Sequence, residues 1–329
     1  MIQPSPTDPS TGSPAYGNPR VSIVIASYGR PGMLKKAIDS ALNQTYPNVE
    51  VIVADDVAPE SCRETILGIR APHFRFHLQS ERVGCWNNWT TAIQMARGEF
   101  IAFLGDDDWL SPDFVAGHLD ALARTPSAAV SICSLREILE DDQVLRTIDA
   151  SFSAMTEVGS SDFLAAALRQ EVFFGAALFR RPLAAEVWDE TRADDYVADH
   201  GLILRLSGVR HVSCTRVSGP VYFKRVHSKQ LSQKYIEVTR LHLNLMHRVR
   251  KLTKSAPHRR LMTEDTAMVA ILLARHLAAN NDLPAARKHL ASAIRLAPTN
   301  LVVWSQYLQA YLTPSRLVRT AQQQRGVGG

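Results

Sequence analysis

The chain has 329 residues, of which 46% are hydrophobic and 21% are charged. This composition is typical of a folded globular protein and excludes a largely disordered chain. The net charge of +5 is unevenly spread: residues 201–329 hold 21 Lys and Arg against 4 Asp and Glu, a net +17, whereas residues 1–200 hold 16 against 28, a net −12. The acidic part suits a cation site. The basic part suits phosphates, an anionic acceptor or an anionic membrane surface, although a solubilising helix surface would have the same composition.

The four cysteines, Cys62, Cys85, Cys133 and Cys214, form no C-x-x-C pair. This spacing disfavours a zinc site or a redox motif and is typical of reduced cytosolic thiols. The sequence shows no signal-peptide pattern and no apolar run of about 18 residues. We therefore predict a cytoplasmic protein with at most a weak peripheral contact with the anionic inner face of a membrane, and we expect no nucleic-acid partner.

Along the chain, short apolar runs alternate with amphipathic stretches. Residues 1–19 are rich in Pro, Ser, Thr and Gly, which predicts a disordered leader. From residue 21 the spacing of apolar residues changes repeatedly between that of a buried strand and that of a helix. The predicted strands are residues 21–26, 49–54, 74–78, 100–104 and 128–135, and the predicted helices are residues 33–45, 62–69, 86–96 and 112–124.

This alternation predicts an α/β fold with a mainly parallel sheet flanked by helices, because parallel strands need a crossover connection between them. Such sheets bind ligands beyond the carboxyl ends of their strands. Two acidic clusters fall at predicted strand ends: Asp55 with Asp56, and the run Asp106, Asp107 and Asp108. We therefore expect the functional site at this edge of the sheet.

From about residue 236 the chain becomes helical and basic, and residues 267–313 resemble one tetratricopeptide-type helical hairpin. One repeat cannot bury its own apolar face, so we expect it to pack on the rest of the chain or on a partner. The predicted division is a leader at 1–19, a catalytic domain at 20–235, a helical extension at 236–315 and a basic flexible tail at 316–329.

The run Asp106, Asp107 and Asp108 is the clearest chemical signal. Adjacent carboxylates repel one another unless a cation neutralises them, and hard oxygen ligands suit Mg²⁺ or Mn²⁺. A solvated acidic loop that caps the next helix is the alternative. The run follows FLG and precedes WL, which places it at a strand end and favours the cation site. Asp55 and Asp56 could accept hydrogen bonds from a nucleobase or a ribose, although Asp is also common in ordinary turns.

Four segments occur together and in order: VSIVIASYGRP at residues 21–31, QTYPN at 44–48, VIVADD at 51–56 and GEFIAFLGDDDW at 98–109. In combination they resemble the family 2 glycosyltransferases of GT-A fold, over about residues 20–230. The resemblance implies a Rossmann-like catalytic domain and a nucleotide-diphosphate sugar donor. It also implies a hydroxyl acceptor, which we expect to be a saccharide or a lipid-linked compound of cell-surface or exopolysaccharide assembly.

The resemblance assigns the nucleotide-sugar site residue by residue. The loop after the first strand, which lies against the nucleobase in the family, falls on Ala26, Ser27, Tyr28 and Arg30. The acid that holds the base in the family corresponds to Asp55 or Asp56. The segment ERVGCWNN at residues 81–88 matches the family's Asn-x-Gly segment, so Arg82 and Asn88 are expected to border the nucleotide, although Arg82 could equally be a surface residue.

The family's metal motif usually reads Asp-x-Asp-Asp, and this chain has Gly105 in place of the first Asp. The resemblance implies Asp107 as the main ligand of Mg²⁺ or Mn²⁺, with Asp106 and Asp108 beside the ribose or supporting the metal. VYFKRVH at residues 221–227 resembles a Tyr-Arg-x-His segment, which makes His227 a metal or diphosphate contact or else a structural histidine. The cations expected to neutralise the leaving diphosphate are Lys224, Arg225 and Lys229.

The family's catalytic base is an Asp at the start of a helix that ends Leu-Arg-Leu, and VADHGLILRL at residues 197–206 fits that pattern. Asp199 aligns with the base, although Ala198 replaces the Glu that precedes it in the family. Asp199 could instead be a helix N-cap, and the pair Asp194-Asp195 is a rival for the base. One base and direct displacement predict inversion at the anomeric carbon.

Two other functions remain open from the sequence. A nucleotidyltransferase would share the fold and the metal, but it would need a Gly-rich basic loop for a triphosphate, and SYGRPG at residues 27–32 is a poor version of one. The other alternative is a degenerate transferase domain that serves as a scaffold for the helical hairpin. Both acidic clusters and Asp199 are retained, which argues against the scaffold.

Overall fold

The computed structural model describes residues 17–57, 62–149, 157–227 and 235–312, so most of the predicted leader, all of the predicted tail and Lys229 lie outside the described residues. The strands are β1 (Val21–Ser27), β2 (Val49–Asp55), β3 (Phe74–Leu78), β4 (Phe100–Gly105), β5 (Trp109–Leu110), β6 (Val130–Ile138), β7 (Val144–Ile148), β8 (Ala177–Arg180) and β9 (Cys214–Arg225). The helices are α1 (Pro31–Leu42), α2 (Arg63–Gly68), α3 (Cys85–Met95), α4 (Phe114–Arg124), α5 (Ser160–Leu168), α6 (Arg181–Asp189), α7 (Ala198–Gly208), α8 (Tyr235–Leu252), α9 (Ala256–Ala279), α10 (Leu283–Leu296) and α11 (Leu301–Leu312), with the 3-10 helices η1 (Phe174–Ala176) and η2 (Arg192–Val197).

The described residues form one nine-stranded sheet in the order β3-β2-β1-β4-β8-β6-β9-β5, with β7 paired to β6. β1 is parallel to β2 and β4, and β2 is parallel to β3. β8 is antiparallel to β4 and β6, whereas β6 and β9 are parallel. The parallel ladders are the longer ones, so the predicted mainly parallel sheet is confirmed, and β8 makes it a mixed sheet.

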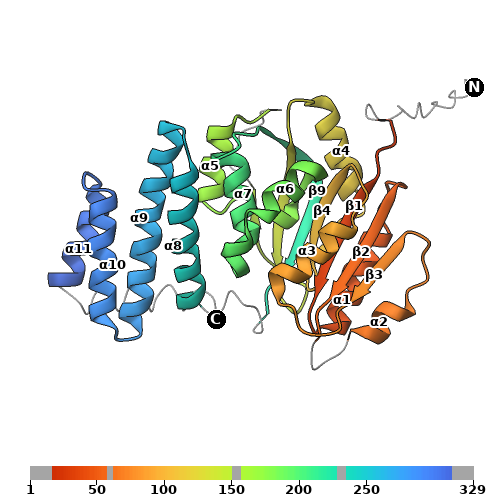
Figure 1. Ribbon diagram of the computed structural model, residues 1–329, viewed down its shortest axis with the longest axis horizontal. Coiled ribbons are helices and arrows are strands. Elements are labelled where there is room, and N and C mark those ends of the chain that lie inside the picture. The colour runs from red at the N-terminus through yellow and green to blue at the C-terminus, as the bar shows by residue number, and fades with distance from the viewer. Residues whose placement is uncertain (1–16, 58–61, 150–156, 228–234, 313–329) are drawn as a thin grey trace, which may run out of the picture.

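The two faces of the sheet are buried under different helices (Figure 1). Ile23 and Ile25 of β1 pack with α1, α2 and α4 on one face. Val24 between them packs on the other face with α3, α5, α6 and α7. A strand buried on both sides reads as a continuous apolar run, which is why periodicity identified β1, β2 and β4.

Helix α1 differs most from its prediction, since it begins at Pro31 and ends at Leu42 instead of spanning 33–45. Proline fits the first helical position because its fixed φ is already helical. After the helix, the amide of Gln44 donates to the carbonyl of Ser111 and accepts from the backbone N–H of Val115. These two bonds direct the chain toward α4.

Helices α8 to α11 stand side by side at the left-hand end of Figure 1. α9 and α10 form the antiparallel pair expected from the sequence, with Ala270, Leu273 and Leu290 in their shared core. α8 packs on η2 and α7, and α9 packs on α5, which confirms that the extension packs on the rest of the chain. The division into domains stays a prediction. None of the described helices combines the length and the apolar character that crossing a membrane requires.

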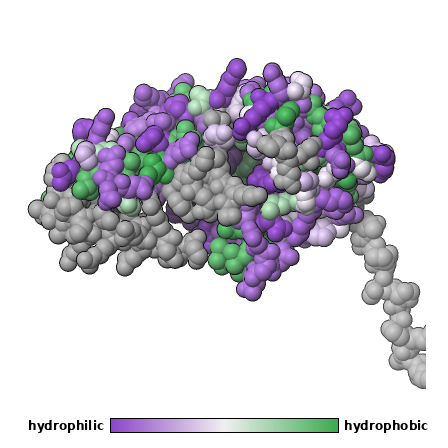
Figure 2. Space-filling model, turned by 90° about the horizontal axis from the view of Figure 1, so that it is seen from below, coloured by the Kyte–Doolittle hydropathy of each residue, from purple (hydrophilic) through white to green (hydrophobic). Residues whose placement is uncertain are grey.

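The carboxyl ends of β1, β2 and β3 point toward the lower edge of Figure 1. Figure 2 shows the molecule from that side, where hydrophilic residues cover most of the described surface. Both acidic clusters lie at this edge, because Asp55 ends β2 and Asp106 directly follows β4.

Candidate active site

The three carboxylates occupy a tight turn between β4 and β5, where the N–H of Asp108 donates to the carbonyl of Gly105 at 3.2 Å. A Cβ atom at position 105 would lie 2.8 Å from Oδ2 of Asp108 and 2.9 Å from Oδ1 of Asp107. Both distances are shorter than normal contacts. Glycine at position 105 therefore lets the two carboxylates fold back over the end of β4.

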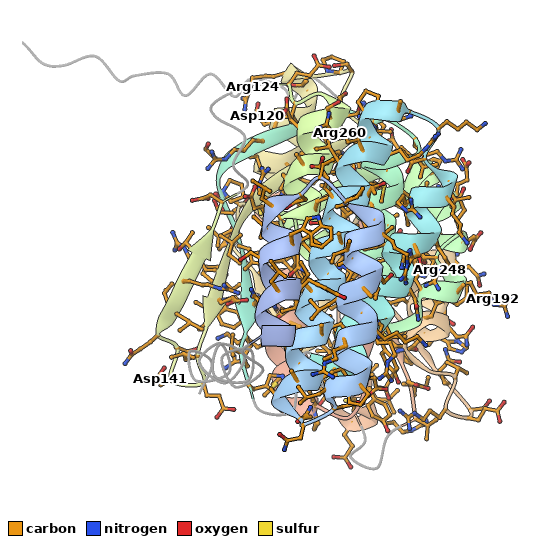
Figure 3. All side chains as sticks on the ribbon, turned by 90° about the vertical axis from the view of Figure 1, so that its left-hand side faces the viewer. Asp120, Arg124, Asp141, Arg192, Arg248 and Arg260 are labelled. Atoms are coloured by element: carbon orange, nitrogen blue, oxygen red, sulfur yellow. The ribbon has the colours of Figure 1, made fainter. Side chains whose placement is uncertain are left out.

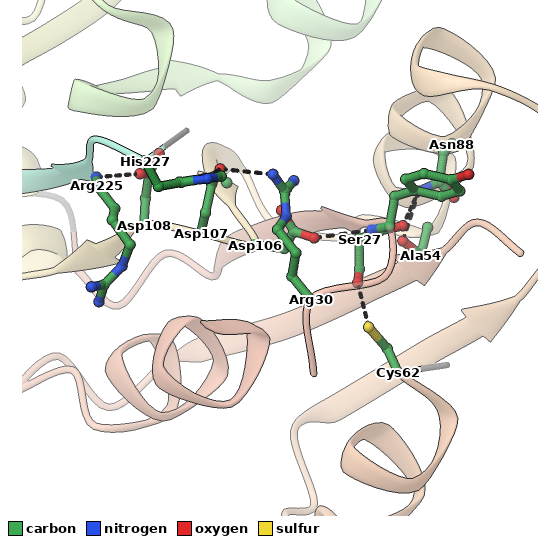
Figure 4. A network of polar contacts seen from close by, with 12 residues as sticks. Ser27, Arg30, Ala54, Cys62, Asn88, Asp106, Asp107, Asp108, Arg225 and His227 are labelled. Atoms are coloured by element: carbon green, nitrogen blue, oxygen red, sulfur yellow. Dashed lines mark hydrogen bonds and ion pairs between the residues drawn. The ribbon is translucent and has the colours of Figure 1, made fainter. Parts of the chain in front are cut away.

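Asp106 is buried against the loop after β1. Its Oδ2 accepts a hydrogen bond of 2.9 Å from the N–H of Tyr28, and its Oδ1 forms an ion pair with the guanidinium of Arg30. Arg30 also reaches Oδ2 of Asp107 at 2.9 Å. One arginine therefore pairs with two adjacent carboxylates and ties the β1 loop to the acidic turn (Figure 4).

Asp107 is the most accessible carboxylate of the turn, with 15% of its side chain exposed against 1% for Asp106. Nε2 of His227 lies 3.0 Å from Oδ2 of Asp107 (Figure 4). Of the predicted metal residues Asp107, Asp108 and His227, Asp107 and His227 are in direct contact, although they are 120 residues apart in the sequence.

Asp108 faces β9 instead. Its Oδ2 accepts from the hydroxyl of Tyr222 at 2.5 Å, and its Oδ1 accepts from the N–H of Arg225 at 2.9 Å. The Tyr222 hydroxyl in turn accepts from the N–H of Gly105. Both oxygens of Asp108 thus already have protein partners. In the more accessible Asp107, by contrast, Arg30 and His227 both contact the same oxygen, Oδ2.

The three carboxyls differ in their pKa values. Burial raises the pKa of Asp106 to about 6 and that of Asp108 to about 8. Burial would also raise the pKa of Asp107, but the hydrogen bond from His227 and the charge of Arg30 lower it below its ordinary value. Asp107 is therefore the carboxyl of the three that is most firmly ionised, as a cation ligand must be.

The second acidic cluster separates into two environments. Asp56 accepts hydrogen bonds from the N–H groups of Val83 at 2.8 Å and Gly84 at 3.0 Å, so it holds the loop before α3. Asp55 is buried, and its Oδ1 has no hydrogen-bond partner among the described residues. Burial raises the pKa of the Asp55 carboxyl. An unsatisfied buried acceptor is costly unless a ligand completes it.

The remaining predicted nucleotide residues surround Asp55. Ala26 lies between Ala54 and Gly105 in the sheet. Ser27 donates from its hydroxyl to the thiol of Cys62 at 3.3 Å.

Asn88 is buried and donates to the carbonyls of Ser27 and Ala54 at 3.2 and 2.9 Å, so it clamps β1 to β2 (Figure 4). The guanidinium of Arg82 lies 4.7 Å from the centre of the exposed Tyr28 ring, at the outer rim of this group.

Asp199 lies in the first turn of α7 and is partly exposed. Burial raises the pKa of its carboxyl, while the neighbouring His200 and Lys224 act in the opposite direction. Lys224 is on β9, the strand that also carries the partners of Asp108, and it pairs with Glu137 at 3.3 Å. The charge of Lys224 therefore acts on both Asp199 and Asp108.

Asp194, one of the two rivals for the base, is fully buried and forms ion pairs with Arg205 and Arg248. Its environment is that of a structural ion pair between η2, α7 and α8. The side chain of Asp195 lies outside the described residues.

Two contributors were missed by the sequence reasoning. Tyr222 fixes Asp108, and its signal in the sequence is its place as the tyrosine of the Tyr-Arg-x-His-like segment at residues 221–227. His200 contacts His242 of α8 and the carbonyl of Ala167 in α5. In the sequence, His200 could have been identified from its position directly after Asp199, the proposed base.

The donor set fits a divalent cation in one specific way. Within the described ranges, no three His, Cys, Asp or Glu side chains are grouped closely enough to hold a metal by themselves. Asp107 and His227 could each supply one ligand, the Nε2 of His227 once a cation replaces its hydrogen bond to Asp107. Mg²⁺ is usually held by one or two carboxylates together with substrate phosphates, and this pair suits such an incomplete site.

The sheet, the acidic turn after β4 and the buried Asp55 with its unpaired Oδ1 at the end of β2 are the arrangement expected of a nucleotide-sugar transferase. The model of the family "Glycosyl transferase family 2" matches residues 22–188, about half of the chain. The chain belongs to this family. Membership favours the transferase over the nucleotidyltransferase alternative.

Curated relatives match in the same region. EpsH of Bacillus subtilis (strain 168), which is named as a glycosyltransferase, is 25% identical over 235 residues, covering 66% of this chain and 64% of EpsH. The GalNAc(5)-diNAcBac-PP-undecaprenol beta-1,3-glucosyltransferase of Campylobacter jejuni is 25% identical over 173 residues, covering 50% of this chain and 53% of the relative. The chain thus spans between half and two thirds of the length of these two relatives.

Solved structures extend the likeness to the whole fold. Staphylococcus aureus TarS 1-349 in complex with UDP-GlcNAc has a TM-score of 0.65 at 11% identity, covering 94% of this chain and 92% of TarS 1-349. The Pyrobaculum calidifontis mannosyltransferase PcManGT in complex with GDP-Man and Mn²⁺ has a TM-score of 0.56 at 15% identity, covering 97% and 88%. At these identities the likeness shows the GT-A fold alone.

Proposed function

We propose that the chain is an inverting glycosyltransferase that moves a sugar from a nucleoside-diphosphate sugar to a hydroxyl of a saccharide or lipid-linked acceptor in the assembly of a cell-surface glycan. The observation that carries this proposal is the ionised Asp107, in contact with His227 and Arg30, at the carboxyl end of β4. The undecaprenol-linked name of the Campylobacter jejuni relative and the UDP-GlcNAc bound to TarS support the two substrate classes.

The donor nucleotide has a cradle in this arrangement. The free Oδ1 of Asp55 can accept a hydrogen bond from a nucleobase N–H, whereas both oxygens of Asp56 already accept from the chain. We therefore assign the base contact to Asp55, with Ala26, Ser27 and Tyr28 beside it. Asp56 and Asn88 would shape this cradle from behind, since both bind backbone groups of its walls.

The diphosphate would lie over Asp107. Mg²⁺ or Mn²⁺, held there by Asp107 and His227, would supply positive charge to the leaving phosphate oxygens. Asp106 would keep Arg30 in place beside the phosphates, and Asp108 would hold β9 through its bonds to Tyr222 and Arg225. Support comes from the Mn²⁺ in the PcManGT complex.

Asp199 is the proposed general base. The acceptor oxygen bonds to the anomeric carbon as the bond from that carbon to the diphosphate breaks, and the hydroxyl proton passes to the Asp199 carboxylate. Attack opposite the leaving group inverts the configuration. A carboxyl whose pKa burial raises is a better proton acceptor than a fully solvated one.

The test is Asp199→Asn, measured as sugar transfer and as donor-nucleotide affinity. A base acts only in the transition state, so we expect kcat to fall about 10²–10⁴-fold with nucleotide affinity unchanged. Metal-dependent donor hydrolysis by the wild type would also exclude the scaffold alternative. Near-normal transfer by Asp199→Asn would remove Asp199 from the mechanism.

We further propose a weak peripheral contact with an anionic membrane. Lys251, Lys254, Arg259 and Arg260 are all exposed around the turn between α8 and α9, and Figure 3 shows Arg260 projecting from the outer helices. Attraction to anionic lipids is worth about 1 kcal/mol per basic residue near the surface and falls with salt.

The variant Lys251→Gln with Lys254→Gln should therefore lower the affinity for anionic vesicles, measured by co-sedimentation at low salt, by about 2 kcal/mol or about 30-fold. Arg124→Gln, an exposed change on α4, is the matched control and should have no effect. Wild-type protein that stays in the supernatant at low salt would contradict the proposal.

A further inference from the structure

The residue after the proposed base is held from two sides. Nε2 of His200 lies 3.0 Å from the carbonyl oxygen of Ala167 near the end of α5, and Nδ1 of His200 contacts Nε2 of His242 on α8. The two rings meet edge to face, with centroids 4.5 Å apart at 77°. His200 therefore joins three helices at the start of α7.

The direction of these hydrogen bonds follows from the carbonyl. A carbonyl oxygen only accepts, so Nε2 of His200 carries the proton and its Nδ1 is bare. Nε2 of His242 must then donate to Nδ1 of His200. Burial lowers the pKa of His200 and that of His242, the latter to about 3, so both rings are neutral and this order is maintained.

A second link from α8 fixes the segment just before α7. Buried Asp194 of η2 pairs with Arg205 of α7 and, at 2.7 Å, with Arg248 of α8. Arg248 and Arg192 of η2 lie at the same edge of the molecule in Figure 3. Gly201 allows this close approach, since a Cβ there would lie 2.5 Å from Oδ2 of Asp194.

We infer that α8 contributes to the transferase site: His242 of α8 hydrogen-bonds to His200 and thereby positions the neighbouring Asp199 carboxylate. The inference rests on the proposed role of Asp199 as the base. The first turn of a helix has unpaired N–H groups and frays easily unless tertiary contacts hold it. A general base displaced by about 1 Å can lose about 10²-fold in rate, so a contact one residue away from the base affects turnover.

The test compares two amides at position 242 in the full chain. The Nε2 of glutamine in His242→Gln can reach the place of the imidazole Nε2, whereas the shorter side chain of His242→Asn cannot. His247→Asn is the matched control, since it makes the same change on α8 at a partly exposed ring that neighbours Arg250 and Lys251.

We expect His242→Asn to lower kcat about 10–100-fold with donor-nucleotide affinity within twofold of wild type. His242→Gln should restore most of kcat, and His247→Asn should match wild type. A role in stability alone would instead lower the melting temperature and leave kcat per folded molecule unchanged. If His242→Asn does not fold, the same comparison is made between His242→Leu and His242→Gln.

The inference is wrong if His242→Asn keeps wild-type kcat, if nucleotide affinity falls together with kcat, or if His242→Gln is as slow as His242→Asn. Asp199→Asn in the same assay distinguishes the proposed base from the positioning role of His242. If Asp199→Asn transfers sugar normally, the proposed base is wrong. If Asp199→Asn is inactive and His242→Asn is not impaired, only the positioning role is wrong.

Discussion

The ion pairs of Asp194 give a sharp test of how η2 and α7 are held. Asp194 is fully buried and contacts Arg205, which is 3% exposed, and Arg248, which is 37% exposed. Asp194→Ala leaves the charge of Arg205 buried without its carboxylate, and breaking such a pair costs about 3–5 kcal/mol. For a chain of this size about 1 kcal/mol corresponds to about 2 °C, so we expect the melting temperature to fall by roughly 6–10 °C.

Chemical and thermal unfolding followed by circular dichroism measure this loss. Arg248→Gln is the control, because Arg248 is itself 37% exposed and Asp194 keeps Arg205 as its buried partner, so we expect a smaller loss of stability. The double change Asp194→Leu with Arg205→Met should recover much of the stability, since no buried charge remains. An Asp194→Ala protein as stable as wild type but without transfer activity would refute the reasoning and make Asp194 the candidate base.

Two further predictions concern the acidic turn and a buried imidazole. Asp107→Asn should abolish turnover and the increase in nucleotide affinity on adding Mn²⁺, with the melting temperature unchanged. Calorimetry with and without metal measures the nucleotide affinity. Full wild-type activity in excess chelator would contradict the metal-binding role of Asp107. His118 is fully buried, with its Nδ1 2.7 Å from the hydroxyl of Ser131, and burial lowers its pKa to about 3. In the unfolded chain His118 binds a proton more readily than in the folded protein. Its contribution to the free energy of unfolding is therefore complete above about pH 6.5 and is lost as the pH falls toward 3, by up to about 1.4 kcal/mol per pH unit. His118→Gln should flatten this part of the stability curve in urea titrations, and an unchanged slope would show that His118 is already protonated in the folded state.

The parallel half of the fold was predictable because its signal is local. β1, β2 and β4 are buried on both faces and read as apolar runs, and each ends next to a polar cluster. The strands of the second half of the sheet, β8 and β9, could not be predicted from local patterns. β8 has only four residues, and the 12-residue β9 carries Gly219 and Pro220, which interrupt its apolar pattern. Their places depend on pairing with β6, which is a tertiary contact.

The candidate site shows the same limit. The sequence brought Asp106, Asp107 and Asp108 together because they are adjacent. It could not show that Tyr222 and the N–H of Arg225 occupy both oxygens of Asp108, since those contacts cross 114 and 117 residues. The choice between Asp55 and Asp56 likewise depended on which backbone N–H groups each carboxylate meets, which no local pattern encodes.

The dependence of the acidic turn on β9 has a consequence for the order in which the protein is made. Asp106, Asp107 and Asp108 leave the ribosome well before Tyr222, Arg225 and His227, which supply most of their partners. At about 10 residues per second this interval is roughly 12 seconds. Among the described residues that pair with these carboxylates, Arg30 is the one cation already made during it. The nascent sheet must therefore remain open between β6 and β5 until β9 arrives. A chaperone or a bound counter-ion that shields these carboxylates would act in this interval, before the folded enzyme exists.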